Sequence, residues 1–174
     1  MKLEVAKKLI EEGIEQTDSK QVWVDLGAGN GLFTYALSTL ISDNSIIYSI
    51  DSDAQSLNAI NIRKPVKLEK ICADFEKENW AAEPLTGVLM ANALHYVKDK
   101  ERLLKKIAES MAPGGRLIIV EYEMEKPNTW VPYPVGFDRL GELVFRTAYK
   151  SIRKLNEVPS VYDHRMIYSV LVRA

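Results

Sequence analysis

The sequence predicts an α/β protein, a three-layer α/β/α sandwich around a mostly parallel seven-stranded sheet that ends in an antiparallel hairpin. Short apolar runs alternate with segments of helical periodicity, which is typical of βαβ units. A glycine-rich turn at residues 27–31 separates the first apolar run from a helical segment. The last two apolar runs, 149–155 and 166–172, have no helix between them, which favours a hairpin at the sheet edge.

Each element follows from a local pattern. Strands are predicted where apolar runs are bounded by polar residues, Pro or Gly: 21–26, 45–50, 66–72, 87–91 and 116–121. Helices are predicted where apolar residues recur every three or four positions. The first is the N-terminal helix, 1–18, whose amphipathic spacing covers 2–16, and the second is 32–41. The third begins at 54 and is ended by Pro65, the fourth begins after Asp99 and is ended by residues 113–115, and the fifth is 136–148. Ser52 or Asp53 can cap the third of these helices, and Asp99 the fourth.

Size and charge limit the possible functions. The 174 residues suit a single domain, 1–174, with one core. Lys and Arg total 23 and Asp and Glu total 24, and no basic block stands out, which argues against a nucleic-acid substrate because phosphate binding needs basic residues. The N-terminus has no apolar signal core, and no run is apolar enough to span a bilayer, so we expect no membrane association.

Cysteine and histidine usage points to a chain without metal or disulfide. Cys72 is the single cysteine, which precludes an internal disulfide and fits a reducing cytoplasm. We expect Cys72 to be a small buried residue near a strand end. The two histidines, His95 and His164, are far apart and lack ligand spacing, so no metal site is predicted, and we expect His164 on the surface.

The most informative stretch is Asp-Leu-Gly-Ala-Gly-Asn-Gly at residues 25–31, where a buried strand runs into a flexible turn. Glycine allows a tight bend and lets a ligand approach the backbone. A dinucleotide-binding turn needs a third glycine where this chain has Leu32. Asp25 would also place a negative charge close to a pyrophosphate, so the turn suits a cationic ligand better.

This stretch resembles the first motif of class I S-adenosylmethionine-dependent methyltransferases, and the likeness extends over nearly the whole chain, through the closing hairpin. The resemblance implies that S-adenosyl-L-methionine is the cofactor. It is expected to be held at the turn by Asp25, Gly27, Ala28 and Gly29.

Polar residues at later strand ends complete the expected cofactor site. Asp51 comes about 20 residues beyond the glycine turn, the spacing at which a carboxylate accepts from ribose hydroxyls, and Ser52 follows it. Asp74 and Phe75 resemble the adenine motif of the family. Asn92 ends the fourth strand, the segment that lines the methyl-transfer site in such enzymes.

The acceptor side is less defined. His95 could take a proton from the acceptor or could be a packed histidine, and Tyr96 follows it. Residues 123–135 form either a flap over the acceptor or a stiff connection, and Trp130 and Tyr133 are candidate acceptor contacts. The segment at the end of the fourth strand, residues 89–96, resembles that of methyltransferases that act on small molecules. It lacks the Asn-Pro-Pro-Tyr motif of enzymes that methylate amino groups of nucleic acids. Many members of the family bind the acceptor with an N-terminal lid or a large insertion, and this sequence offers only its first helix and residues 123–135 for that purpose. We therefore expect an acceptor site that is open, completed by the N-terminal helix, or supplied by another subunit.

Three functions compete at this point. The first is methyl transfer to the oxygen, nitrogen or carbon of a small molecule. The second is a non-catalytic S-adenosylmethionine-binding subunit that activates a partner. The third, a nicotinamide-dependent oxidoreductase, conflicts with Leu32, Asp25 and the hairpin. The sequence does not specify the acceptor or the oligomeric state.

Overall fold

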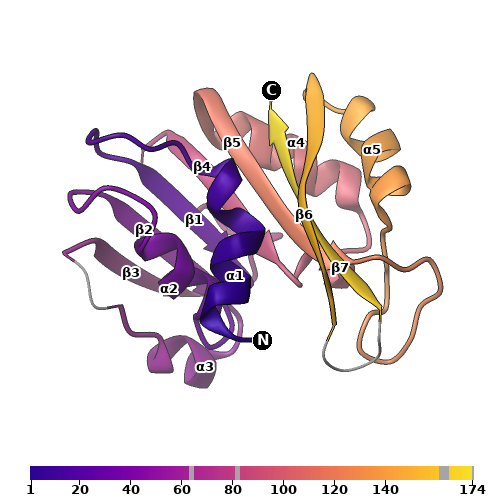
Figure 1. Cartoon of the computed structure of the whole chain (residues 1–174), viewed down its shortest axis with the longest axis horizontal. Coiled ribbons are helices and arrows are strands. Elements are labelled where there is room, and N and C mark those ends of the chain that lie inside the picture. Colours follow the sequence, from indigo (N-terminus) through magenta and orange to yellow (C-terminus); the bar gives the residue numbers. More distant parts are fainter. Residues whose placement is uncertain (63–64, 81–82, 161–164, 174) are drawn as a thin grey trace.

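The computed structural model describes residues 1–62, 65–80, 83–160 and 165–173. They form one mixed seven-stranded sheet in the order β3-β2-β1-β4-β5-β7-β6 (Figure 1). The strands are β1 (Val22–Leu26), β2 (Ile46–Asp51), β3 (Lys67–Cys72), β4 (Leu85–Ala91), β5 (Met111–Tyr122), β6 (Ser151–Pro159) and β7 (Met166–Arg173). Strands β1 to β5 pair in parallel, whereas β7 is antiparallel to both β5 and β6. The predicted fold class, including the closing hairpin, is confirmed.

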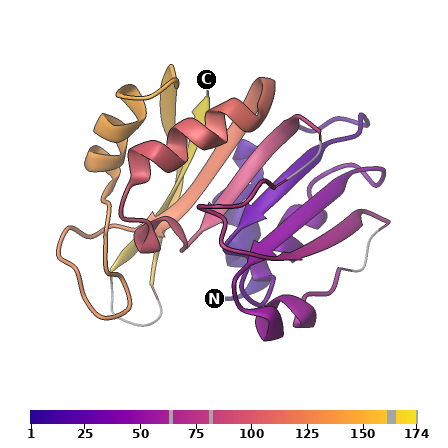
Figure 2. The same ribbon diagram turned by 180° about the vertical axis from the view of Figure 1, so that it is seen from behind.

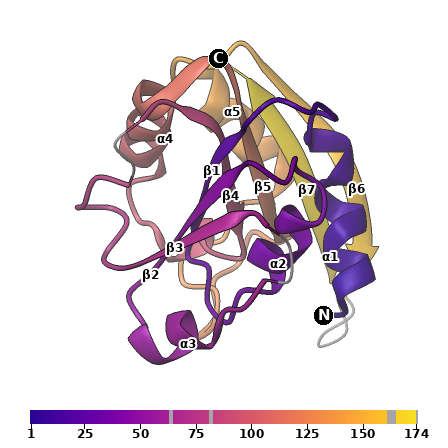
Figure 3. The same ribbon diagram turned by 90° about the vertical axis from the view of Figure 1, so that its left-hand side faces the viewer.

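Helices cover both faces of this sheet. They are α1 (Leu3–Ile10), α2 (Leu32–Ser38), α3 (Ala54–Ala59), α4 (Lys100–Ser110) and α5 (Phe137–Phe145), with short 3-10 helices η1 (Glu11–Gly13) and η2 (Leu94–Tyr96). Figure 3 shows α1 and α2 on one side of the sheet, and Figure 2, seen from behind, shows α4 and α5 on the other. Within the described ranges, no helix combines the length and apolarity needed to cross a membrane.

Two apolar clusters hold the three layers together. On one face, α1 and α2 bury Leu9 and Leu37 against Trp23 of β1. On the other face, α4 and α5 bury Leu104 and Leu140 against the neighbouring residues of the same strands. Every residue of β1 is buried, because a central parallel strand has helices over both of its faces. This double burial explains why Val22, Trp23 and Val24 are all apolar instead of alternating with polar residues.

Several elements differ from the prediction in their bounds: β6, for example, ends at Pro159 rather than 155, and α2 ends at Ser38 rather than 41. The N-terminal helix ends at Ile10 and continues only as the turn η1, whereas the sequence predicted a helix over 1–18. A Cβ atom on Gly13 would lie 2.7 Å from Cδ1 of Ile118, so the chain approaches β5 closely there and leaves the helical path. Strand β5 begins at Met111 rather than 116, because Met111 pairs with Leu85 of β4.

The helix caps predicted from the sequence are confirmed, whereas the expected burial of the cysteine is not. Asp53 and Asp99 are confirmed as helix caps, accepting from the backbone N–H groups of Gln55 (2.9 Å) and Arg102 (3.1 Å). The expectation for Cys72 is wrong: its side chain is exposed, because β3 is the edge strand of the sheet. His164 lies outside the described residues.

Replacing Gly87 should destabilise the fold. A Cβ atom there would lie 2.7 Å from Cε3 of the fully buried Trp23, so Gly87→Ala should lower the free energy of unfolding by ~1–3 kcal/mol, measured by urea denaturation. Gly141 in α5 is the control, because its Cβ position is open and alanine should stabilise the helix by ~0.5–1 kcal/mol. A Gly87→Ala protein as stable as wild type would contradict this packing.

Candidate functional site

The glycine turn folds back over the carboxyl end of β2. The N–H groups of Gly27 and Ala28 both donate to the carbonyl oxygen of Ile50, at 2.8 and 3.0 Å. The N–H of Gly29 donates to Oδ2 of Asp51 at 2.7 Å. The turn is therefore fixed by the strand that supplies the predicted ribose-binding carboxylate.

Glycine is required in this turn for two different reasons. Gly27 and Gly31 have φ of 74° and 82°, and a Cβ atom on either would lie 2.6 Å from a carbon of Ala93 or Ile60. Gly29 also has a positive φ, but no atom lies within 4 Å of its Cβ position. The outer glycines permit close packing, and the middle one borders open space where a ligand can approach the backbone.

Asp25 lies beneath this turn rather than on its surface. Its side chain is buried, and its Oδ2 accepts a hydrogen bond from Oγ1 of Thr34 at 2.6 Å. Burial raises the pKa of the Asp25 carboxyl from 3.8 to about 7, against the opposing effect of the Thr34 hydrogen bond and with a smaller contribution from the Asp51 charge. Its charge is thus sensitive to its surroundings, and a cation bound at the turn would favour the ionised form.

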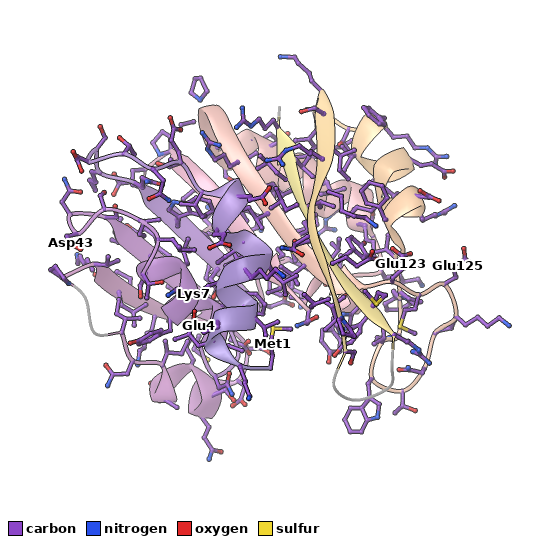
Figure 4. All side chains as sticks on the ribbon, viewed as in Figure 1. Met1, Glu4, Lys7, Asp43, Glu123 and Glu125 are labelled. Atoms are coloured by element: carbon purple, nitrogen blue, oxygen red, sulfur yellow. The ribbon has the colours of Figure 1, made fainter. Side chains whose placement is uncertain are left out.

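A cavity of about 700 Å³ opens beside the turn. It brings together the predicted residues Gly27, Ala28, Gly29 and Asn92. Residues at the N-terminal end of α1 form another part of its wall: Met1, just before the helix (Figure 4), together with Lys2 and Val5. No ligand contact was predicted for these N-terminal residues individually, although the N-terminal helix was one of the elements expected to complete the acceptor site.

A second cavity, of about 430 Å³, lies under the segment between β5 and α5. Its lining residues are mostly aromatic or apolar: Asn92, His95, Tyr96, Tyr122, Met124, Asn128, Trp130, Val131 and Arg165. Three of the predicted acceptor-side residues, His95, Tyr96 and Trp130, therefore meet here. The two cavities share Asn92 and Tyr122, so they are adjacent spaces at the end of the same strands.

Asn92 has two unusual features at this junction. Its backbone has φ of 53°, the only positive φ among the described non-glycine residues. Its Oδ1 is buried, and it has no hydrogen-bond partner within the described part of the chain. A buried acceptor without a partner costs about 1–3 kcal/mol, so a ligand that donates a hydrogen bond at this position would recover that energy. A cofactor with an ammonium group has the chemistry to do so.

His95 is held by a carboxylate that was not predicted from the sequence. Nδ1 of His95 lies 2.8 Å from Oε2 of Glu121, and the backbone N–H of His95 donates to Oε1 at 3.1 Å. Both side chains are buried, with exposed fractions of 3% and 1%. An acidic residue at the end of the apolar run of β5 was the available signal, since a buried carboxylate needs a partner.

The predicted ribose and adenine residues lie beside the turn, outside the lining of the larger cavity. Oδ1 of Asp51 accepts from the N–H of Asp53 at 2.8 Å, and Ser52 is exposed next to it. Asp74 pairs with Lys77 at 2.7 Å, and the Lys77 ammonium lowers the pKa of that carboxyl. The ring of Phe75 packs beside Gly27.

The predicted acceptor contacts Trp130 and Tyr133 are placed differently. Trp130 lines the smaller cavity and is 78% exposed at its rim. Tyr133 is not among the residues lining that cavity; its N–H donates to the carbonyl of His95 (2.9 Å), and its own carbonyl accepts from Nζ of Lys100 (2.7 Å). The end of the segment is thereby pinned to η2 and α4.

The buried Asp25 generates a prediction about pH. Its folded-state pKa of about 7 lies above its ordinary value of 3.8, so its contribution to stability is present below pH 3.8 and is lost as pH rises through about 7. The Asp25→Asn variant keeps an acceptor for the Thr34 hydroxyl, but its side chain does not ionise, so this loss of stability should be absent in this pH range. Urea denaturation at about pH 5 and about pH 8 should show a steeper fall for wild type, approaching ~3 kcal/mol, because about two pH units lie between pH 5 and the folded-state pKa and each is worth ~1.4 kcal/mol. Parallel pH profiles would contradict it.

Comparison with known proteins agrees with this geometry. Residues 24–119 match a family model described as a methyltransferase domain. Trans-aconitate 2-methyltransferase of Pseudomonas aeruginosa is 33% identical over 97 residues, covering 53% of this chain and 33% of the relative. The chain therefore spans about a third of the length of the curated relatives it matches.

Two solved structures share the fold. A SAM-dependent methyltransferase from Aquifex aeolicus has a TM-score of 0.70 at 16% identity, covering 96% of this chain and 88% of that one. Phosphoethanolamine N-methyltransferase 2 of Haemonchus contortus, in complex with S-adenosyl-L-methionine, has a TM-score of 0.73 at 11% identity, covering 97% and 51%. At these identities the likeness shows the fold alone. Because the family model matches more than half of the chain, from β1 into β5, the chain belongs to the class I S-adenosylmethionine-dependent methyltransferase family.

Proposed function

We propose that this chain transfers a methyl group from S-adenosyl-L-methionine to a small-molecule acceptor at the junction of its two cavities. The observation that carries the proposal is the position of Asn92, which lines both cavities and holds a buried acceptor without a partner among the described residues. A transferase that brings two molecules together needs two adjacent spaces that meet at the reacting atoms. The glycine-turn cavity serves the donor and the cavity beside His95 serves the acceptor.

The residues around the turn match the chemistry of the donor. The carboxylate of Asp51 has about four acceptor positions, of which the N–H groups of Gly29 and Asp53 use two, so it can also accept from ribose hydroxyls. We assign Asp74 and Phe75 to binding the adenine, and the side-chain oxygen Oδ1 of Asn92 to accepting a hydrogen bond from the ammonium group of the donor. The bound cofactor supplies an electrophilic methyl group on a sulfonium. The chain contributes orientation and exclusion of water.

The acceptor cavity favours a small molecule. Its volume of about 430 Å³ lies within the ~300–1,000 Å³ typical of small-ligand sites, and aromatic rings form much of its wall. The names of two relatives refer to trans-aconitate and phosphoethanolamine, which are small molecules. The near-zero formal charge of the chain supports the same class of acceptor.

Asp51→Ala should weaken the binding of S-adenosylhomocysteine at least ~10-fold, or ~1.4 kcal/mol, measured by isothermal titration calorimetry. The variant loses the proposed ribose acceptor and also the bond that holds Gly29. Asp53→Ala is the matched control, because the Asp53 side chain caps α3 two residues further on and accepts from Gln55 and Ser56 rather than from the turn. NAD is the control ligand. An Asp51→Ala affinity within about twofold of wild type would remove the ribose assignment.

Wild-type protein mixed with S-adenosylmethionine and a library of small metabolites should release S-adenosylhomocysteine with at least one acceptor class. Trp130→Ala removes a cavity wall and should raise KM for that acceptor, with little effect on S-adenosylhomocysteine affinity, because Trp130 lines only the acceptor cavity. Turnover that appears only when a partner protein is added would favour the non-catalytic subunit instead.

A further inference from the structure

We propose that Glu121 holds His95 with its proton on Nδ1, so that Nε2 is the proton acceptor for a hydroxyl-bearing methyl acceptor. The inference rests on the proposed function and narrows its substrate class to molecules methylated on a hydroxyl oxygen. In this arrangement His95 is the catalytic residue, and Glu121 is a positioning residue that acts through it.

The contact between these side chains is specific in its geometry. One carboxylate oxygen of Glu121 is 2.8 Å from Nδ1 of His95, and the other accepts the backbone N–H of the same residue at 3.1 Å. The N–H of Tyr122 lies 3.3 Å from Oε2. The backbone and the ring of His95 therefore hold both oxygens of the Glu121 carboxylate in one orientation, and the carboxylate in turn fixes the imidazole ring.

The chemistry of the contact defines the tautomer. An ionised carboxylate only accepts hydrogen bonds, so the ring nitrogen 2.8 Å from it has to be the donor. Nδ1 of His95 must therefore carry the proton, which leaves the lone pair of a neutral imidazole on Nε2. Within the described ranges Nε2 makes no hydrogen bond, and the ring lines the acceptor cavity. With Nδ1 on Glu121, Nε2 lies on the other side of a ring that borders the acceptor cavity.

A base at this position matters most for a hydroxyl acceptor, because a neutral hydroxyl is a poor nucleophile until it loses its proton, whereas a neutral amine attacks with its own lone pair. When a hydroxyl oxygen bonds to the methyl carbon, the bond between that carbon and the sulfonium sulfur breaks, S-adenosylhomocysteine leaves with the electron pair, and the lone pair on Nε2 takes the hydroxyl proton. The resulting imidazolium is stabilised by the buried carboxylate of Glu121, 2.8 Å from its other nitrogen. A carboxylate acceptor carries no proton at neutral pH and would gain nothing from this pair.

Glu121→Gln gives a sharp test because an amide cannot accept at both positions. If the amide oxygen keeps the His95 backbone N–H, the amide NH₂ faces Nδ1, and the imidazole must move its proton to Nε2. The chain has two histidines, so His164→Gln leaves His95 as the only one. In that background, ¹⁵N NMR of labelled histidine at about pH 8 should show Nδ1–H when Glu121 is native and Nε2–H in the Glu121→Gln variant.

Glu123→Gln is the matched control. Glu123 lies two residues further along (Figure 4), and its carboxylate accepts the N–H of Phe137 at 3.2 Å rather than any atom of His95. This variant should keep the Nδ1–H tautomer. The protein with native Glu121 decides the question even if Glu121→Gln fails to fold: a proton on Nε2, or on both ring nitrogens, would overturn the inference.

Turnover gives a second readout once an acceptor is found. Glu121→Gln should lower kcat on a hydroxyl acceptor by ~10²–10⁴-fold with little change in KM, and should leave S-adenosylhomocysteine affinity within about twofold of wild type. Methylation of carboxylate or amine acceptors only would overturn the substrate class. Failure of the native protein to bind S-adenosylhomocysteine would instead remove the proposed function, so the two failures are distinguishable.

Discussion

The hydrogen bonds between the glycine turn and the carboxyl end of β2 are the constraint on which the rest of the site depends. The chain leaving β1 must reverse over the neighbouring strand within a few residues, and the N–H groups of Gly27, Ala28 and Gly29 are satisfied by Ile50 and Asp51. Only residues without a Cβ can pass under Ala93 and Ile60 in this path. The same reversal starts α2, buries Asp25 beneath it and leaves open space at Gly29.

Two buried acids serve this site in different ways. Asp25 is bonded to the hydroxyl of Thr34, and burial raises its pKa, so its charge responds to what binds above it. Glu121 is bonded to His95, which gives it a partner that can itself become charged. Asp25 lies outside the lining of the larger cavity but comes just before the turn that borders it, whereas His95, the partner of Glu121, lines the smaller cavity, and Asn92 lines both. Attraction for a cation and acceptance of a proton are separated in space.

Local patterns were sufficient to predict the order of strands and helices and the turn itself. The apolar run of β1 and the glycines after it are signals within ten residues of one another, and the two final runs predicted the hairpin. The length of α1 and the exposure of Cys72 were not predictable in this way. The first depends on Gly13 meeting Ile118, and the second on β3 lying at the sheet edge.

The acceptor side shows the same limit. His95 and Glu121 are 26 positions apart, and the carbonyl of Tyr133 accepts a hydrogen bond from Lys100 of α4, which is 33 positions away. No spacing rule connects such pairs before the sheet order is known. The cytoplasmic location, the absence of a metal and the roles of the individual site residues stay predictions.

A crystal structure of the chain with S-adenosylhomocysteine tests the central claim most directly. We predict that the ribose hydroxyls will lie on Asp51, the amino-acid tail will lie along residues 27–29, and the sulfur will face Asn92 and the cavity beside His95. A ligand with its sulfur directed away from that cavity, or an empty glycine turn at saturating ligand, would contradict it.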